Sequence, residues 1–148
     1  AVYLPGGYPE LHAARLAANS HFLGGLRSAA EDSLPIYGEC GGYMVLGEAL
    51  CDAKGVSHQM AGLLAVETSF AQPRLSLGYR QFTTTEATPF GPAGSRYRGH
   101  EFHYATIVGE AEDDPIFVTS DAAGRKLGAV GRCRGSVFGS FLHLIDLD

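Results

Sequence analysis

One cysteine among small residues marks the part of this chain best suited to chemistry. The segment PIYGECGGYMVLG (residues 35–47) is typical of a short strand, a sharp turn that carries Cys40, and then a helix. Gly38 and Gly41 flank the cysteine, and a nucleophile on a tight turn needs such small neighbours. The N-terminus of the helix would favour the thiolate, the nucleophilic form. A buried structural cysteine, the commoner fate of a free Cys, fits the local sequence equally well.

A cysteine nucleophile needs a base that takes its proton and later returns it to a leaving amine. Among six histidines, His143 is the candidate, because it follows an apolar strand that contains Gly139 and Ser140. Functional residues of α/β sheets collect at strand ends. A surface or capping histidine near the C-terminus accounts for His143 equally well.

A glycine pair offers a third element of such a site. Gly6 and Gly7 follow the apolar run of residues 2–4, where their backbone N–H groups can be presented without a side chain in the way. An oxyanion hole needs fixed N–H donors of this kind. An ordinary turn is the alternative interpretation.

The stretch RGHEFHY (residues 98–104) has H-x-x-H spacing, but it does not predict a metal site. On a strand, His100 and His103 point to opposite faces. Glu101 and His103 share a face, which predicts a polar contact pair. Together with Gly6 they are candidate substrate contacts, and two partly exposed strand residues are the plainer alternative.

The elements that must position these residues change in character along the chain. A strand at residues 1–4, helices at 10–18 and 20–30 with Ser20 as the cap of the second, a strand at 35–37 and a helix at 43–50 predict an α/β fold. Its sheet would be Rossmann-like and mostly parallel, flanked by helices. After about residue 52, β-branched and aromatic residues predict additional strands, at 63–66, 75–85, 97–108, 116–120, 126–133 and 136–141.

Composition narrows the class of protein. The chain has 148 residues, enough for one domain, and with 45% hydrophobic and 18% charged residues it is globular. A net charge of −5 argues against a nucleic-acid partner. Three cysteines without a C-x-x-C pair predict neither a disulfide framework nor a zinc site, which fits a reducing cytoplasm. No apolar window long enough for a membrane span is present, so no membrane partner is expected.

Four motifs in order carry a family resemblance: LPGGYPEL (residues 4–11), GECGGYM (38–44), RGHEFHY (98–104) and GSFLHL (139–144). They resemble the C-terminal glutamine amidotransferase domain, of the class I triad type, of the cobyrinic (hydrogenobyrinic) acid a,c-diamide synthases. The resemblance covers nearly the whole chain, so residues 1–148 are expected to form one such domain. The chain lacks an initiator Met and starts inside a strand, which predicts an N-terminally truncated fragment of a two-domain protein.

The resemblance implies roles for particular residues of this chain and for a second domain. Cys40 would attack the side-chain amide of L-glutamine, His143 would be its general base and acid, and Gly7 and Gly41 would form the oxyanion hole. The ammonia would pass to an ATP- and Mg²⁺-binding synthetase domain, absent here, that amidates the a and c carboxylates of the corrin precursor. No nucleotide-binding loop is visible in this chain, so no cofactor of its own is expected. A sheet edge left open by truncation would invite association, so a homodimer is a further expectation.

Two positions depart from the broader triad amidotransferases. Met44 stands where those enzymes carry a Gln, and Ile145 stands where a carboxylate follows the base. Asp146 would orient His143 only if a turn intervenes. These departures leave open a catalytically silent amidotransferase-like binding or assembly module. The glycine-flanked turn at Cys40 would fit another cysteine hydrolase of small amides equally well.

Overall fold

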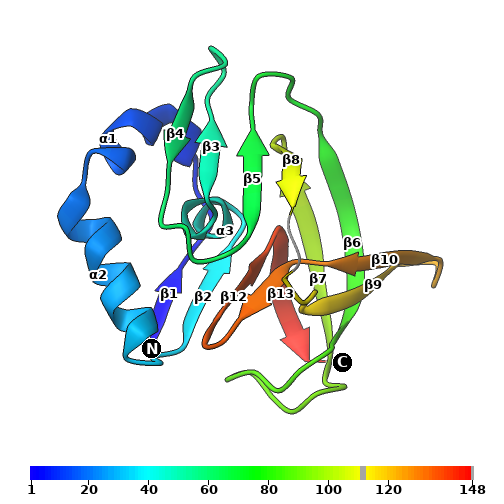
Figure 1. The fold of residues 1–148 in the computed structure, drawn as a ribbon. Helices are drawn as coiled ribbons and strands as arrows, with labels where there is room; N and C mark the ends of the chain where they lie inside the picture. The colour runs from blue at the N-terminus through cyan, green and yellow to red at the C-terminus, as the bar shows by residue number, and fades with distance from the viewer. Residues whose placement is uncertain (111–112, 148) are drawn as a thin grey trace.

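The first third of the chain alternates between strands and helices, as predicted. The computed structural model describes residues 1–110 and 113–147. Its first elements are β1 (Val2–Leu4), the 3-10 turn η1 (Pro9–His12), α1 (Ala13–Ala17), α2 (Ser20–Glu31), β2 (Ile36–Glu39) and α3 (Gly41–Leu46). β1 and β2 pair in parallel, and Figure 1 shows α1 and α2 beside them at one side of the molecule. Helical crossovers between parallel strands are the expected connection.

The rest of the chain is almost entirely β-structure. Its strands are β3 (Ala49–Cys51), β4 (Ser57–Gln59), β5 (Val66–Ser69), β6 (Ser76–Thr84), β7 (Arg96–His103), β8 (Thr106–Glu110), β9 (Phe117–Asp121), β10 (Lys126–Val130), β11 (Arg132–Arg134), β12 (Val137–Ser140) and β13 (Leu142–Leu147). They and the first two strands form three sheets, with the orders β1-β2-β12-β11, β10-β9-β6-β7-β13 and β4-β3-β5-β8.

Parallel pairing is confined to a small part of these sheets. β12 returns from the far end of the chain to lie parallel to β2, and β3 pairs in parallel with β5. Apart from β1 with β2, the other strand pairs among the described residues are antiparallel. The α/β class with additional strands is therefore confirmed, and the parallel portion is the part that leads into Cys40. β1 ends its sheet, and the homodimer expected from an open edge stays a prediction.

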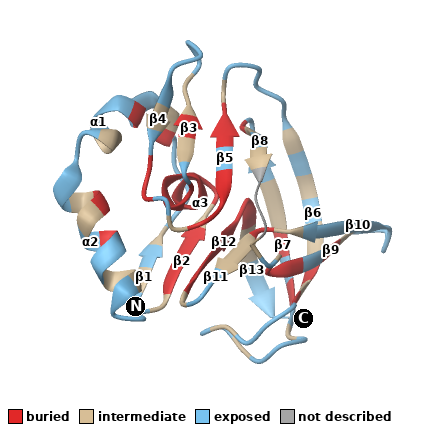
Figure 2. Cartoon of the chain, in the orientation of Figure 1, coloured by how far each residue is buried: buried red, intermediate tan, exposed pale blue. Residues whose placement is uncertain are grey.

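The core has two parts on the two faces of β2 and β12. Side chains alternate along a strand, so Ile36 and Val137 face the cluster around α3, while Tyr37 and Phe138 face a second cluster. Every residue of α3 is buried, as Figure 2 shows by its red colour, whereas α2 is buried only along its inner side. No helix of the described residues is long and apolar enough to cross a membrane.

Several predicted boundaries were wrong. The helix expected at residues 43–50 ends at Leu46, because Gly47 is extended and Leu50 pairs within the sheet as part of β3. The cap of α2 is Asn19 and not Ser20, since the Asn19 side chain accepts a hydrogen bond from the Phe22 N–H at 3.0 Å. The strand expected at 63–66 only begins at Val66.

Two expected strands are each divided in the structure. The run 97–108 breaks after His103, because the chain leaves the five-stranded sheet there and enters another as β8. The run 126–133 breaks at Gly131, whose φ of 71° is readily accessible to glycine, and the chain bends there into another sheet. Both breaks are changes of sheet, which periodicity along the chain does not reveal.

Candidate active site

Cys40 lies on a strained turn between β2 and α3, as the sequence predicted. Its φ of 51° and ψ of −105° are unusual for a residue with a side chain. The Cys40 N–H donates a hydrogen bond to the carbonyl of Ser140 at 2.8 Å, and the Cys40 carbonyl accepts one from the Met44 N–H at 3.2 Å. The turn is thus fixed at once to β12 and to the first turn of α3.

The glycines around this turn allow backbones to meet. A Cβ on Gly41 would lie 2.7 Å from the carbonyl oxygen and 2.8 Å from the nitrogen of Gly7, and a Cβ on Gly38 would lie 2.6 Å from Leu46 Cδ1. A Cβ on Gly7 would meet no atom within 4 Å. Gly41 is therefore required for space, whereas Gly7 contributes only its backbone.

Burial makes the resting form of Cys40 a thiol. Desolvation raises the pKa of the Cys40 thiol to about 11; the Gly41 N–H, which hydrogen bonds to the sulfur, opposes this, and the nearby charges of Glu39 and Glu10 add to it. This differs from the thiolate expected from the sequence, because α3 is short and the side chain is buried. A base must therefore remove the proton as the sulfur attacks.

His143 is placed to be that base. It follows β12, the strand that contains Gly139 and Ser140, as expected; it lies near the start of the next strand, β13, and lines the same cavity as Cys40. A Cβ on Gly6 would lie 3.0 Å from His143 Cε1 and 3.7 Å from Cys40 Cβ, so both side chains lie next to that glycine. The predicted pair is thus brought together by a parallel strand and an antiparallel one, β2 and β13.

Glu39 holds His143, a contact that the sequence reasoning missed. Oε1 of Glu39 lies 2.9 Å from Nδ1 of His143, so Nδ1–H donates to the carboxylate and leaves Nε2 free to accept a proton. The Tyr37 hydroxyl lies 3.5 Å from the other oxygen, Oε2. Asp146, the carboxylate considered from the sequence, accepts the Leu147 N–H and is exposed. In the sequence Glu39 directly precedes Cys40, and this adjacency could have indicated that Glu39 belongs to the site.

The ring of His100 packs against one face of the His143 ring. It is the cross-strand partner of His143, and their rings stack with centroids 4.7 Å apart and planes at 10°. Burial, and next the nearby His143, lower the pKa of His100, while Glu39 acts against this. A neutral His100 therefore packs on His143 without placing a second positive charge beside it.

The cavity that contains Cys40 has a volume of about 380 Å³. It is lined by Gly6, Gly7, Tyr8, Glu10, Cys40, Met44, Phe70, Phe102, His103, Tyr104 and His143. Its size and mostly apolar wall with a few polar groups are typical of a small-molecule site. Of the residues predicted from the sequence, Gly41 lies behind Gly7 at the turn, and Glu101 does not line this cavity.

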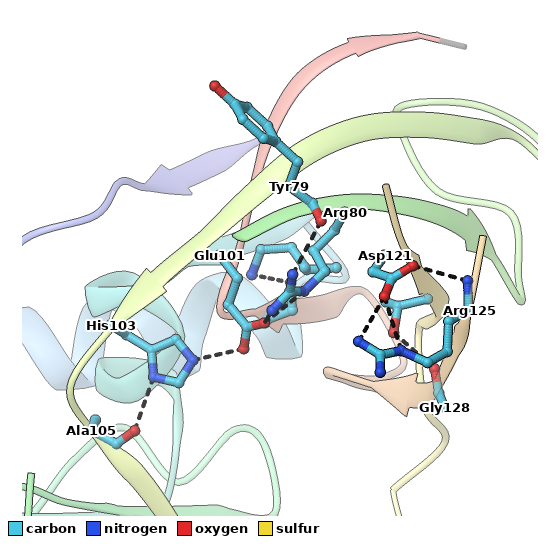
Figure 3. A network of polar contacts seen from close by, with 11 residues as sticks. Tyr79, Arg80, Glu101, His103, Ala105, Asp121, Arg125 and Gly128 are labelled. Carbon is cyan, nitrogen blue, oxygen red and sulfur yellow. Dashed lines mark hydrogen bonds and ion pairs between the residues drawn. The ribbon is translucent and has the colours of Figure 1, made fainter. Parts of the chain in front are cut away.

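Glu101 lies outside the cavity wall and holds the side chain of His103, which lines the cavity. Figure 3 shows Glu101 between two partners: its Oε1 is 2.8 Å from His103 Nε2, and its Oε2 is 2.8 Å from Arg80 Nη2. The hydrogen bond from His103 is the largest of the contacts that lower the pKa of Glu101, and Arg80 adds to it. The predicted polar pair is confirmed. His103 also contacts the Ala105 carbonyl and stacks on Phe141, so its ring is rigidly held.

No group of three or more His, Cys, Asp or Glu side chains within residues 1–110 and 113–147 is arranged to hold a metal ion. What the cavity offers is a buried thiol, a histidine held by a carboxylate, and backbone N–H groups beside the sulfur. This set is suited to acyl transfer through a thioester.

The fold is that of glutamine amidotransferases. PurLQS from Thermotoga maritima aligns with a TM-score of 0.62 over 95% of this chain and 66% of that chain, at 19% identity. A glutamine amidotransferase from Thermotoga maritima aligns with a TM-score of 0.54 over 95% of this chain and 55% of that one, at 16% identity. At such identities the likeness concerns the fold alone.

The family follows from the sequence comparison. The model of the CobB/CobQ-like glutamine amidotransferase domain matches residues 1–147, and the chain belongs to this family. Hydrogenobyrinate a,c-diamide synthases of Brucella anthropi and Rhodobacter capsulatus are 54% identical over 146 and 144 residues, and that of Sinorhizobium sp is 55% identical over 148. These matches cover 97–99% of this chain but 33% of each relative, so the chain spans about a third of their length. The resemblance seen in the four motifs is confirmed.

Proposed function

We propose that this domain hydrolyses L-glutamine and supplies ammonia to an amide-forming ligase. The observation that carries the proposal is that Cys40 and His143 line one cavity, while Glu39, outside its wall, contacts His143 Nδ1 and leaves Nε2 free. Family membership favours glutamine as the amide. The three free cysteines fit a reducing compartment, and we place the reaction in the cytoplasm.

In this mechanism His143 Nε2 accepts the thiol proton as Cys40 Sγ attacks the side-chain carbonyl carbon of glutamine. The oxyanion of the tetrahedral intermediate is received by the N–H groups of Gly7 and Gly41. The C–N bond then breaks, and His143 returns the proton to the leaving amine, which departs as ammonia. Water hydrolyses the glutamyl thioester to glutamate and regenerates the thiol, with His143 again as base. Glu39 holds the imidazole and stabilises its protonated form.

For the whole protein we propose amidation of the a and c carboxylates of hydrogenobyrinic or cobyrinic acid. The relatives that are hydrogenobyrinate a,c-diamide synthases support this, since they are 54% and 55% identical to this chain over the 33% of their length that it spans. Activation of the carboxylates would use ATP and Mg²⁺ on a separate N-terminal domain. Residues 1–148 would then be the glutaminase half of a two-domain enzyme.

Site-mapped labelling tests the glutaminase role. The full-length protein is exposed to a glutamine-like electrophile with and without excess glutamine, and the adducts are located by mass spectrometry. We expect glutamine-protected modification of Cys40. Cys133 is the matched control, because burial raises its pKa to about 11 as well, yet it lies outside the cavity. Equal labelling of both cysteines would favour a silent binding module.

Cys40→Ser in the full-length enzyme provides the functional counterpart. We expect amidation from glutamine to be lost and amidation from free ammonia to be retained. Equal loss with both nitrogen sources would contradict the assigned role of Cys40. Efficient hydrolysis of simple amides without preference for glutamine would instead identify a small-amide hydrolase.

A further inference from the structure

One carboxylate in the active-site cavity lacks a partner. Glu10 belongs to η1 and lines the cavity together with Cys40. Its Oε2 atom is buried and has no hydrogen-bond partner among the described residues. Buried polar atoms of folded proteins are nearly always paired, and leaving one unpaired costs free energy. An unpaired oxygen at the wall of a cavity therefore indicates that a donor is bound there when the site is occupied.

The surroundings of Glu10 do not supply this donor. Burial raises the pKa of the Glu10 carboxyl, and its own backbone N–H and the charge of His12 offset this only in part. Among the described residues that line the cavity there is no Lys or Arg, and Glu10 is the one carboxylate. The cavity thus has a place for a cation at Glu10.

The substrate proposed above carries such a cation. Glutamine has an α-ammonium group separated from the amide carbon by three carbon atoms, which puts the two about 5 Å apart in an extended conformation, as standard bond lengths dictate. One cavity holds both the sulfur that attacks the amide carbon and the Glu10 carboxylate. Met44, which also lines the cavity, has only a thioether and offers Glu10 no hydrogen-bond donor.

We propose that Glu10 binds the α-ammonium group of glutamine and so selects an α-amino acid amide over other amides. This assignment rests on the proposed glutaminase function and deepens it. An ammonium on a buried carboxylate forms a charge-assisted hydrogen bond, which is stronger than a neutral one. A site built to bind a polar substrate group discriminates strongly against analogues that lack it.

Binding at Glu10 also affects the nucleophile. The negative charge of Glu10 is one of the contributions that hold the Cys40 thiol in its protonated form. A bound ammonium neutralises this charge, so proton transfer from Cys40 to His143 becomes easier once the correct substrate is in place. The same contact then serves recognition and activation.

The test compares two amides in the full-length enzyme. Glutamine carries the α-ammonium group, whereas glutaramate is the same molecule with hydrogen in its place. We expect Glu10→Gln to lower kcat/KM for glutamine about 100-fold, largely through KM, and to leave kcat/KM for glutaramate within about threefold. Glu10→Asp should lie in between. Glu31→Gln, on the exposed end of α2, is the matched control and should change neither value.

The outcomes separate this proposal from the one on which it rests. Suppose that the wild-type enzyme hydrolyses glutamine but Glu10→Gln lowers kcat/KM for glutamine and for glutaramate by the same factor. Glu10 then has no role in binding the ammonium group, and the glutaminase function stands. If wild-type enzyme hydrolyses neither amide, both proposals fail. Calorimetric binding of glutamine to Cys40→Ser and to the Cys40→Ser/Glu10→Gln double variant gives an independent reading. Equal affinity of these two folded proteins would overturn the Glu10 proposal.

Discussion

The nucleophile and its base come from two regions that are built in different ways. Cys40 sits where two parallel strands and a buried helix meet, and backbone packing fixes it there, with Gly41 against Gly7 and the Cys40 N–H on Ser140. His143 sits on an antiparallel strand, and side chains fix it, with Glu39 on Nδ1 and His100 stacked on the ring. The Cys40 region depends on residues without bulky side chains, whereas the His143 region depends on polar and aromatic side-chain partners.

This difference predicts two kinds of sensitivity. Adding atoms near Cys40 should disturb the turn itself, because the neighbours are backbone and cannot move aside. Removing partners near His143 should leave the fold intact and change only the orientation and charge of the imidazole.

The largest effect is expected at the turn. Gly41→Ala would place a methyl group 2.7 Å from the Gly7 carbonyl oxygen, so we expect destabilisation by about 1–3 kcal/mol and at least a 1,000-fold loss of glutaminase activity. Gly7→Ala is the matched control, because its methyl group would meet no atom within 4 Å. Thermal unfolding and glutamate release measure the two effects. Similar stability losses in both variants would remove steric packing as the explanation.

The next largest effect is expected when the carboxylate that contacts His143 is removed. Glu39→Ala removes the group that orients His143 and stabilises its protonated form, so kcat for glutamine hydrolysis should fall about 100-fold. Glu39→Gln keeps the shape and should fall less. Ammonia-dependent amidation should be unchanged in both.

Asp146→Asn provides the control for Glu39. The sequence makes Asp146 an alternative orienting group, but in the structure its carboxylate is exposed and bound to the Leu147 N–H. Glutaminase activity should stay within twofold of the wild type. A loss as large as that of Glu39→Ala would show that β13 rearranges during turnover.

A smaller, pH-dependent effect follows from the buried thiol. With its pKa raised to about 11, Cys40 is a thiol at neutral pH, and its thiolate fraction rises tenfold per pH unit until about pH 11. Alkylation of Cys40 by iodoacetamide in the free protein should follow this slope between pH 7 and 10, as should that of Cys133. A plateau for Cys40 near neutral pH would show a thiolate already formed before substrate binds.

What the sequence could predict differs between the two regions for the same physical reason. The turn at Cys40 is local: strand, glycines and helix lie within about a dozen residues, so their types and spacing reveal it. The contacts of His143 are not local, since Glu39 lies 104 residues away and meets it only because β12 pairs with β2 and β13 follows β12. Periodicity along one strand does not identify its partners.

The smallest effect is expected from His100, the residue that only the register of β7 and β13 reveals. Its pKa is lowered, so it becomes charged only below its ordinary value of about 6.5, and protonation there places a positive charge beside His143. His100→Phe keeps the stacked ring without that charge. Activity near pH 7.5 should change less than threefold, while the acid limb of kcat should shift to higher pH, because a positive charge on residue 100 no longer opposes protonation of the base. An unchanged acid limb would mean that the stack contributes packing alone, and the base would then depend on Glu39 for its electrostatics.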